Sequence, residues 1–92
     1  MRYEWDPEKN ERLKAERNIS FEKILFHLAR CDVWKLADHP DQENYPGQKI
    51  YFVAVEGYIY LVPHVVEKDY VFLKTIIPSR KATRAYKKEQ EG

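Results

Sequence analysis

The chain has 92 residues, of which 43% are hydrophobic and 34% are charged. A chain of this size buries only about 60–65% of its unfolded surface, so it supports one hydrophobic core. Its apolar runs fall short of the roughly 18 residues of a membrane helix, and its start lacks the apolar region of a signal peptide. We therefore expect a single cytoplasmic domain over residues 1–92. Cys31 is the only cysteine; we expect a buried or idle thiol and no disulfide framework.

The net charge of +1 identifies no partner, but the charges are unevenly distributed. Residues 74–88 contain six basic side chains and no acidic one, whereas residues 38–43 contain three acids and no Lys or Arg. A basic segment on a nearly neutral protein favours a phosphate backbone as partner. A solvated helix face would give the same pattern, so both interpretations stay open.

Three helices are expected. A short edge strand over 3–5 precedes a helix over 7–17, which has a preferred N-cap residue and a proline at its first position. Asn18 can end that helix in a left-handed turn. A second helix, over 21–29 with Ser20 as its cap, has a core-facing stripe at helical spacing, made of Phe21, Ile24, Leu25 and Leu28. Ser79 caps the third helix, over 80–89.

Four further strands are expected over 33–37, 49–55, 58–66 and 70–77. The polar stretch 39–47 contains two prolines and a glycine and is expected to be a loop. Glu56-Gly57 is a hairpin turn of two residues, and residues 67–69 form a turn of three. The expected fold is therefore α+β, a small antiparallel sheet packed on helices.

These turns predict the strand register and hence the two faces of the sheet. His64 should oppose Lys49 and Phe72, and Val62 should oppose Lys74. One face is almost purely apolar and should cover the core: Ile50, Phe52, Ala54, Ile59, Leu61, Pro63, Val65, Val71, Leu73, Thr75 and Ile77. The other mixes aromatic, His and Lys side chains: Lys49, Tyr51, Val53, Val55, Tyr58, Tyr60, Val62, His64, Tyr70, Phe72, Lys74 and Ile76. The mixed face suits RNA, but a second packing layer or a protein partner would fit it as well.

The residue types present suit metal-independent cleavage of RNA. The three histidines lack helical metal-ligand spacing, the acids do not form an EF-hand loop, and no cofactor is expected. In metal-independent cleavage a base activates the 2′-hydroxyl, cations hold the phosphorane, and an acid protonates the leaving oxygen. The candidate catalytic residues are Arg80, His64 and Lys74. The candidate RNA-binding residues are Lys49, Tyr60, Lys81, Arg84 and Lys87.

Three segments of the chain resemble the BrnT family of bacterial toxins. Residues 5–9 match the family's opening Trp-Asp-Pro-x-Lys pattern, and residues 19–22 match the start of its second helix. Residues 76–83 match its closing motif, Ile-Ile-Ser-Ala-Arg-Lys-Ala-Thr. The matches lie in order and at family spacing over nearly the whole chain.

This resemblance implies a RelE-like fold and an endoribonuclease that stops translation. It also implies a ribbon-helix-helix-like antitoxin that neutralises the toxin, with operator DNA bound only through the antitoxin. The family's functional arginine falls on Arg80.

The chain departs from the family pattern at several positions. Glu16, Arg17 and Asn18 replace a Lys-His-Gly sequence, so that histidine is absent. Pro78 replaces a serine, and an arginine frequent in the last strand falls on Thr75. If the missing family residues are needed for cleavage, the chain would be weak, differently specific or inactive. His64 and Lys74 could substitute for them, an inference from their predicted proximity and not from the family.

Two other functions remain open on the sequence. A toxin-like domain could hold a protein or RNA partner without catalysis. A DNA-binding regulator is less favoured, because no helix-turn-helix with a basic recognition helix is present.

Overall fold

Three helices form where the sequence predicts them in a computed structural model of the chain, which describes residues 2–91. They are α1 (Pro7–Arg17), α2 (Phe21–Ala29) and α3 (Arg80–Glu91). The Asp6 side chain accepts a hydrogen bond from the backbone N–H of Glu8, and Asn18 ends α1 with a left-handed φ of 52°. The Ser20 hydroxyl accepts from the N–H of Lys23. All three expected caps, Asp6, Asn18 and Ser20, are confirmed.

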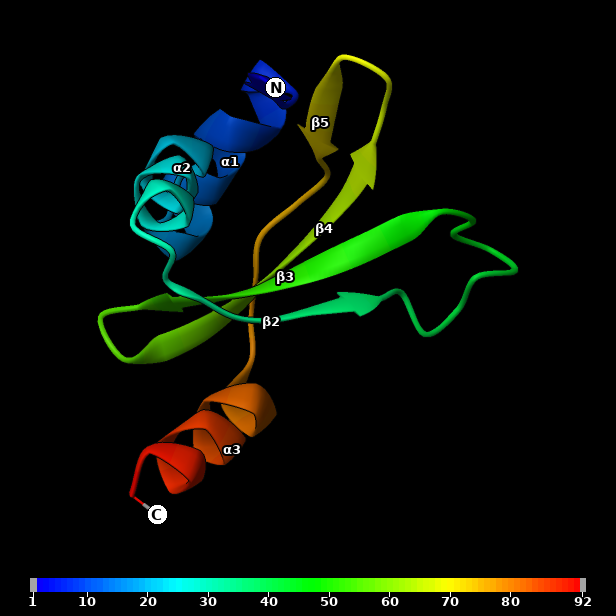
Figure 1. Cartoon of the computed structure of the whole chain (residues 1–92). Helices are drawn as coiled ribbons and strands as arrows, with labels where there is room; N and C mark the ends of the chain where they lie inside the picture. Colours follow the sequence, from blue (N-terminus) through cyan, green and yellow to red (C-terminus); the bar gives the residue numbers. More distant parts are fainter. Residues whose placement is uncertain (1, 92) are drawn as a thin grey trace.

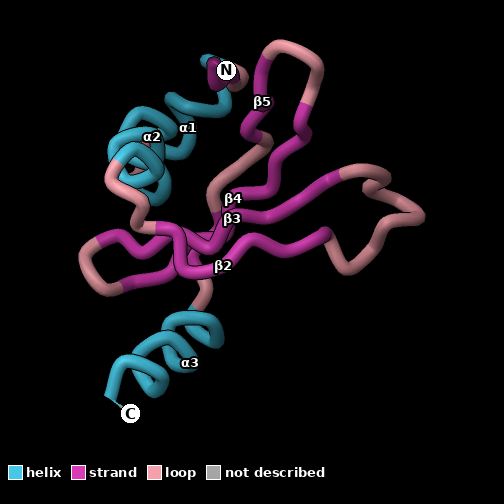
Figure 2. Tube along the Cα trace, in the orientation of Figure 1, coloured by secondary structure: helices cyan, strands magenta, loops and turns pink. Residues whose placement is uncertain are grey.

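The strands form one mixed sheet of six (Figures 1 and 2). They are β1 (Arg2–Glu4), β2 (Val33–Asp38), β3 (Gln48–Val55), β4 (Tyr58–Val66), β5 (Tyr70–Leu73) and β6 (Ile77–Pro78). The order is β1-β5-β4-β3-β2, with β6 paired to β4. β1 runs parallel to β5, and the other pairs are antiparallel. The α+β class and the edge position of the first strand are confirmed, whereas an all-antiparallel sheet is not.

The β3–β4 hairpin has the predicted register. Lys49 pairs with His64 and Val53 with Tyr60. Glu56 and Gly57 both have positive φ, at 52° and 83°, which a tight two-residue hairpin turn requires. The Glu56-Gly57 turn therefore fixes this register as expected.

The predicted β4–β5 register is wrong by one residue. His64 pairs with Leu73 and not with Phe72, and Phe72 pairs with Val65. The N–H of Glu67 donates to the carbonyl of Tyr70 at 2.8 Å, so the turn consists of residues 68–69 and not of 67–69. A two-residue turn in place of a three-residue turn moves every side chain of β5 to the other face.

The last predicted strand, 70–77, is interrupted. Lys74 donates its backbone N–H to the carbonyl of Pro63 at 2.8 Å, and Pro63 has no N–H to return. β5 therefore ends at Leu73, and pairing resumes at Ile77, opposite Leu61.

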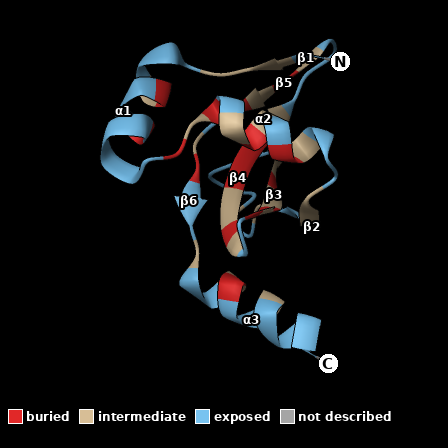
Figure 3. Ribbon diagram, turned by 90° about the vertical axis from the view of Figure 1, so that its left-hand side faces the viewer, coloured by how far each residue is buried: buried red, intermediate tan, exposed pale blue. Residues whose placement is uncertain are grey.

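The main core lies between the sheet and the pair α1 and α2. It contains Leu13 of α1, Phe21 and Ile24 of α2, and inward side chains of the strands, among them Val53, Val55, Val62, Val71 and Leu73. The apolar stripe of α2 is confirmed, and α1 is exposed apart from Leu13, Asn10 and the half-buried Lys9 (Figure 3). Asn10 joins the two helices: its amide oxygen accepts from the N–H of Phe21, and its amide nitrogen donates to Glu22, both at 2.8 Å.

This arrangement corrects the predicted assignment of the two sheet faces. The face of Val53, Val62 and His64, expected to be open, is the one that α1 and α2 cover. The face of Phe52, Leu61 and Pro63, expected to carry the core, is the one next to α3. Both faces are rich in apolar residues, so hydrophobicity alone did not decide between them.

α3 lies across the strands from α1 and α2 (Figure 1). The buried hydroxyl of Thr83 accepts from the N–H of Ile59 at 2.8 Å and donates to the carbonyl of Ser79 at 2.7 Å. The N–H of Ser79 donates to the carbonyl of Ile59 at 3.0 Å. These bonds fix the start of α3 against β4. Among the described residues, no helix is long and apolar enough to cross a membrane.

Candidate nucleic-acid interface

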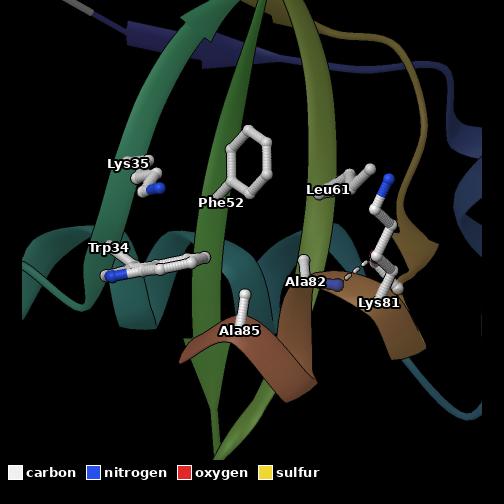
Figure 4. Close-up of a pocket in the computed structure, with 8 residues that line it drawn as sticks. Trp34, Lys35, Phe52, Leu61, Lys81, Ala82 and Ala85 are labelled. Atoms are coloured by element: carbon white, nitrogen blue, oxygen red, sulfur yellow. Dashed lines mark hydrogen bonds between the residues drawn. The ribbon is translucent and has the colours of Figure 1, made fainter. Parts of the chain in front are cut away.

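A groove opens between the first turns of α3 and the outer face of the sheet (Figure 4). Its volume is about 380 Å³. The floor comes from three neighbouring strands and the wall from α3; the lining residues are Trp34, Lys35, Phe52, Leu61, Ser79, Lys81, Ala82 and Ala85. Small alanines on α3 leave room beside the aromatic floor.

A β-bulge places two consecutive residues of β2 in this groove. The β2–β3 pairing shifts between Val33 and Lys35, so Trp34 is the unpaired extra residue. Neighbouring strand residues normally point to opposite faces, but a bulge re-aims a side chain. Both Trp34 and Lys35 therefore line the groove, a placement that the sequence did not reveal.

The indole of Trp34 is held from several sides. It makes edge contacts with Phe52 and Tyr86, with ring centroids 6.2 and 5.5 Å apart. Its Nε1–H donates to Glu89 at 3.2 Å, and the Lys35 ammonium lies 4.3 Å from its ring centroid. An aromatic floor beside cations is the combination on which single-stranded nucleic acid stacks.

Arg80 is the first residue of α3 and stands between Ser79 and Lys81, but it is not one of the residues that line the groove. The Ser79 hydroxyl accepts from the N–H of Ala82 at 3.0 Å, which confirms Ser79 as the cap. Arg80 is exposed, and no ion pair involves it among residues 2–91. An ion pair between Arg80 and an acid on α1 is therefore not present.

His64 lies in the core and not on an open surface. It is 1% exposed, its ring stacks on Tyr51 with centroids 3.8 Å apart, and its Nδ1–H donates to the carbonyl of Val62 at 2.9 Å. Burial lowers the pKa of His64, and the nearby Lys49 charge lowers it further. This position corrects the expectation that His64 and Lys74 share an exposed face, and we do not place His64 in the RNA site.

Two other predicted RNA-binding residues lie on the face opposite the groove. Lys49 is paired with His64 as expected, but its ammonium binds Asp38 at 2.8 Å. Tyr60 packs against the core and contacts Tyr58 edge-on at 5.5 Å. Burial raises the pKa of neighbouring Tyr51, and its contact with Tyr3 raises it further, so Tyr51 stays protonated near neutral pH.

The remaining predicted residues lie on the groove side or on α3. Lys81 lines the groove, and its side chain extends beside Leu61 (Figure 4). Arg84 and Lys87 are exposed on α3. Lys74 lines a second hollow together with residues that sequence reasoning did not select: His39, Tyr45, Gln48, Pro63, Thr75 and Ile77. His39 and Tyr45 come together through the fold of a polar loop, and the sequence of this loop has no periodic pattern that would predict their contact.

Two further residues discussed from the sequence, Cys31 and Arg17, line neither the groove nor the second hollow. Cys31 is exposed and has a positive φ of 64°, so of the expected buried or idle thiol the buried alternative is wrong. Arg17 donates a hydrogen bond to the carbonyl of Ile76 at 2.6 Å. Within residues 2–91, no group of three or more His, Cys, Asp or Glu side chains could hold a metal ion.

Comparison with protein-family models, curated proteins and solved structures found no match to this chain.

Proposed function

We propose that this protein is a metal-independent endoribonuclease, the toxin of a toxin–antitoxin pair, acting on RNA in the cytoplasm. The observation that carries the proposal is the groove beside α3, which joins an aromatic floor to Lys35 and Lys81. Arg80 is exposed and stands in the chain between Ser79 and Lys81, two of the lining residues. The resemblance of residues 76–83 to the BrnT closing motif supports it. A RelE-like fold would follow from the same family assignment.

The chemistry follows from the groups around the groove. A base removes the 2′-hydroxyl proton, the 2′-oxygen attacks phosphorus, the bond from phosphorus to the 5′-oxygen breaks, and an acid protonates that oxygen. The Arg80 guanidinium can hold two phosphorane oxygens, at the positive end of a helix dipole. The polar side chains that line the groove include Lys35, Ser79 and Lys81, so solvent water would take up the 2′-hydroxyl proton and a charged lysine would protonate the leaving oxygen.

One observation favours a second candidate, an RNA-binding module without cleavage. The groove holds no histidine or carboxylate, because His64 is in the core and the family histidine is replaced by Arg17. Cations and aromatic rings suffice for binding. Only the chemical step separates the two candidates.

We expect Arg80→Ala to lower the cleavage rate about a hundredfold to a thousandfold, the usual cost of losing one donor to a developing oxyanion. Arg80→Lys should restore little, because an ammonium cannot make the paired hydrogen bonds of a guanidinium. Arg12→Ala, an exposed arginine on α1, is the matched control. The measurement is the single-turnover rate on a labelled RNA, with melting temperatures as a check on folding.

Equal rates for the Arg80→Ala and Arg12→Ala variants would remove Arg80 from the mechanism. RNA binding without cleavage by the unmodified chain would select the binding module.

The partner in this proposal is an antitoxin that pairs with the open edge of the sheet at β2, whose residues Trp34 and Lys35 line the groove. β2 is the last strand of the sheet order, and Leu36 on it is 58% exposed. An open strand edge has unpaired backbone groups, and together with an exposed apolar side chain it favours binding of another protein chain. We expect a small protein encoded by the neighbouring reading frame to co-purify with this chain and to block RNA binding. Separate elution of the two proteins at micromolar concentration would contradict the toxin assignment.

A further inference from the structure

The second hollow lies on the same face of the sheet as the groove and next to it. Leu61 lines the groove and Ile77 lines the hollow, and these two residues pair across β4 and β6. Pro63, also in the hollow, is two residues beyond Leu61 on the same strand, which is roughly 6.6 Å along it. A strand of RNA in the groove would therefore continue into the hollow.

The loop that forms one wall of the hollow is fixed by its own hydrogen bonds. Gln42 donates from its amide to the carbonyls of His39 and Gln48 and accepts from the N–H of Gly47. The N–H of Tyr45 donates to the carbonyl of Asp41 at 3.0 Å. A loop held in this way presents its side chains in one arrangement, which lowers the entropy lost on binding.

Two rings of this loop form a stacked pair at the hollow. The rings of His39 and Tyr45 lie 4.3 Å apart and 28° from parallel, and Tyr45 is 45% exposed. An exposed ring of this kind is a platform for a base, since every nucleobase has a π face.

The hydrogen bonding of His39 fixes its tautomer. Its Nδ1 accepts the N–H of Asp41 at 3.0 Å, so in the neutral ring the proton is on Nε2. His39 can therefore donate a hydrogen bond to a ligand from Nε2 but cannot take up a proton there. It is a binding group and not a catalytic base.

Lys74 supplies the positive charge of the hollow. Its ammonium lies 5.4 Å from the ring centroid of Phe72, and no salt bridge involves it among the residues that the structure describes. None of the residues that line the hollow is acidic. The charge is thus available to a phosphate.

We propose that this hollow binds one nucleotide of the RNA strand, with its base stacked on Tyr45 and its phosphate held by Lys74 and the Nε2–H of His39. The volume of about 350 Å³ is near the lower end of the roughly 300–1,000 Å³ of small-ligand sites, as a single nucleotide requires. This inference rests on the proposed function, because it takes RNA as the ligand, but it concerns the binding of RNA and not its cleavage.

The test uses the full chain and a 2′-O-methyl RNA tetranucleotide, which cannot be cleaved. We expect Tyr45→Ala to weaken its binding about fivefold to a hundredfold, the usual effect of losing one stacked base. Tyr45→Phe, which keeps the ring, should bind within about twofold of the unmodified chain.

Lys74→Gln should also weaken binding and should lower the slope of log affinity against log salt by about 0.7, the value for one phosphate contact on a single strand. Lys74→Arg should keep the slope. Lys68→Gln, in the exposed turn after β4, is the matched control and should change nothing.

Wild-type-like affinity and salt slope in both the Tyr45→Ala and Lys74→Gln variants would overturn the inference, and so would an absence of tetranucleotide binding by the unmodified chain at millimolar concentration. Cleavage of ordinary RNA by the unmodified chain and by the same variants is measured in a separate experiment. Failure of cleavage with intact, Tyr45-dependent binding would contradict the endoribonuclease proposal alone.

Discussion

The imidazole of His64 is neutral in the folded protein at neutral pH because its surroundings disfavour the charged form. Burial removes water from the ring, Lys49 is the charged group that lowers its pKa further, and Tyr51 covers one face. The hydrogen bond to Val62 acts in the opposite direction but is the smaller effect. A histidine in this position stabilises the core only while it remains unprotonated.

Acid pH is therefore expected to destabilise the fold through His64. The unfolded chain binds this proton near the ordinary histidine pKa of 6.5, whereas the folded chain binds it only at lower pH. The stabilisation is complete above that pKa and is lost as the pH falls toward the folded value. The free energy of unfolding of His64→Gln, measured by urea denaturation between about pH 7 and 5, should depend less on pH than that of the unmodified chain. If the free energy of unfolding depends on pH equally in the two proteins, His64 is not the group that causes the loss of stability in acid.

At the scale of the element, α3 determines whether a groove exists. It packs against β4 through Thr83 and Ser79. Those two residues anchor the helix, while Arg80 and Lys81 between them are exposed. One short motif thus combines anchoring residues with residues that can contact RNA.

Thr83→Val should lower the free energy of unfolding by about 1–3 kcal/mol, because it leaves the buried N–H of Ile59 without an acceptor. Thr83→Ser keeps the hydroxyl and should cost less than Thr83→Val. Urea denaturation of the two variants measures the difference. If the serine variant is as unstable as the valine variant, packing of the methyl group and not the hydrogen bond holds α3.

The helices could be predicted from sequence because their signals are local. Asp6, Asn18, Ser20 and Ser79 act on neighbouring backbone groups, and each is found in the predicted role. The β4–β5 register could not be predicted, because it depends on whether Glu67 joins the turn or the ladder. That choice decides which side of β5 faces the core.

At the scale of the whole molecule, the two sides of the sheet differ in how far helices cover them. One side is closed by α1 and α2 and contains the core, with His64 and Tyr51 included. The other is only partly covered by α3 and carries the groove and the adjacent hollow. The cations and aromatic rings of the proposed RNA site thus lie on the side with the least packing.

The candidate site was only partly predictable for the same reason. Arg80 and Lys81 could be selected from sequence because they stand at a recognisable strand-to-helix junction. Trp34 and Lys35 share a face only through a bulge, and His39 meets Lys74 only because the loop after β2 folds back beside β4. Contacts that depend on a bulge or on the fold of a long loop give no periodic pattern in the amino-acid sequence from which they could be predicted.

The most direct test of the central claim is to identify the ends that the purified chain leaves on RNA in the presence of EDTA. Attack by the 2′-oxygen produces a 2′,3′-cyclic phosphate and a free 5′-hydroxyl, with cations from the protein holding the charge. The account predicts that cleavage persists in EDTA, that these ends form, and that Arg80→Ala suppresses them. Activity that is lost on chelation and restored by magnesium or manganese, or products with 5′-phosphate ends, would contradict it.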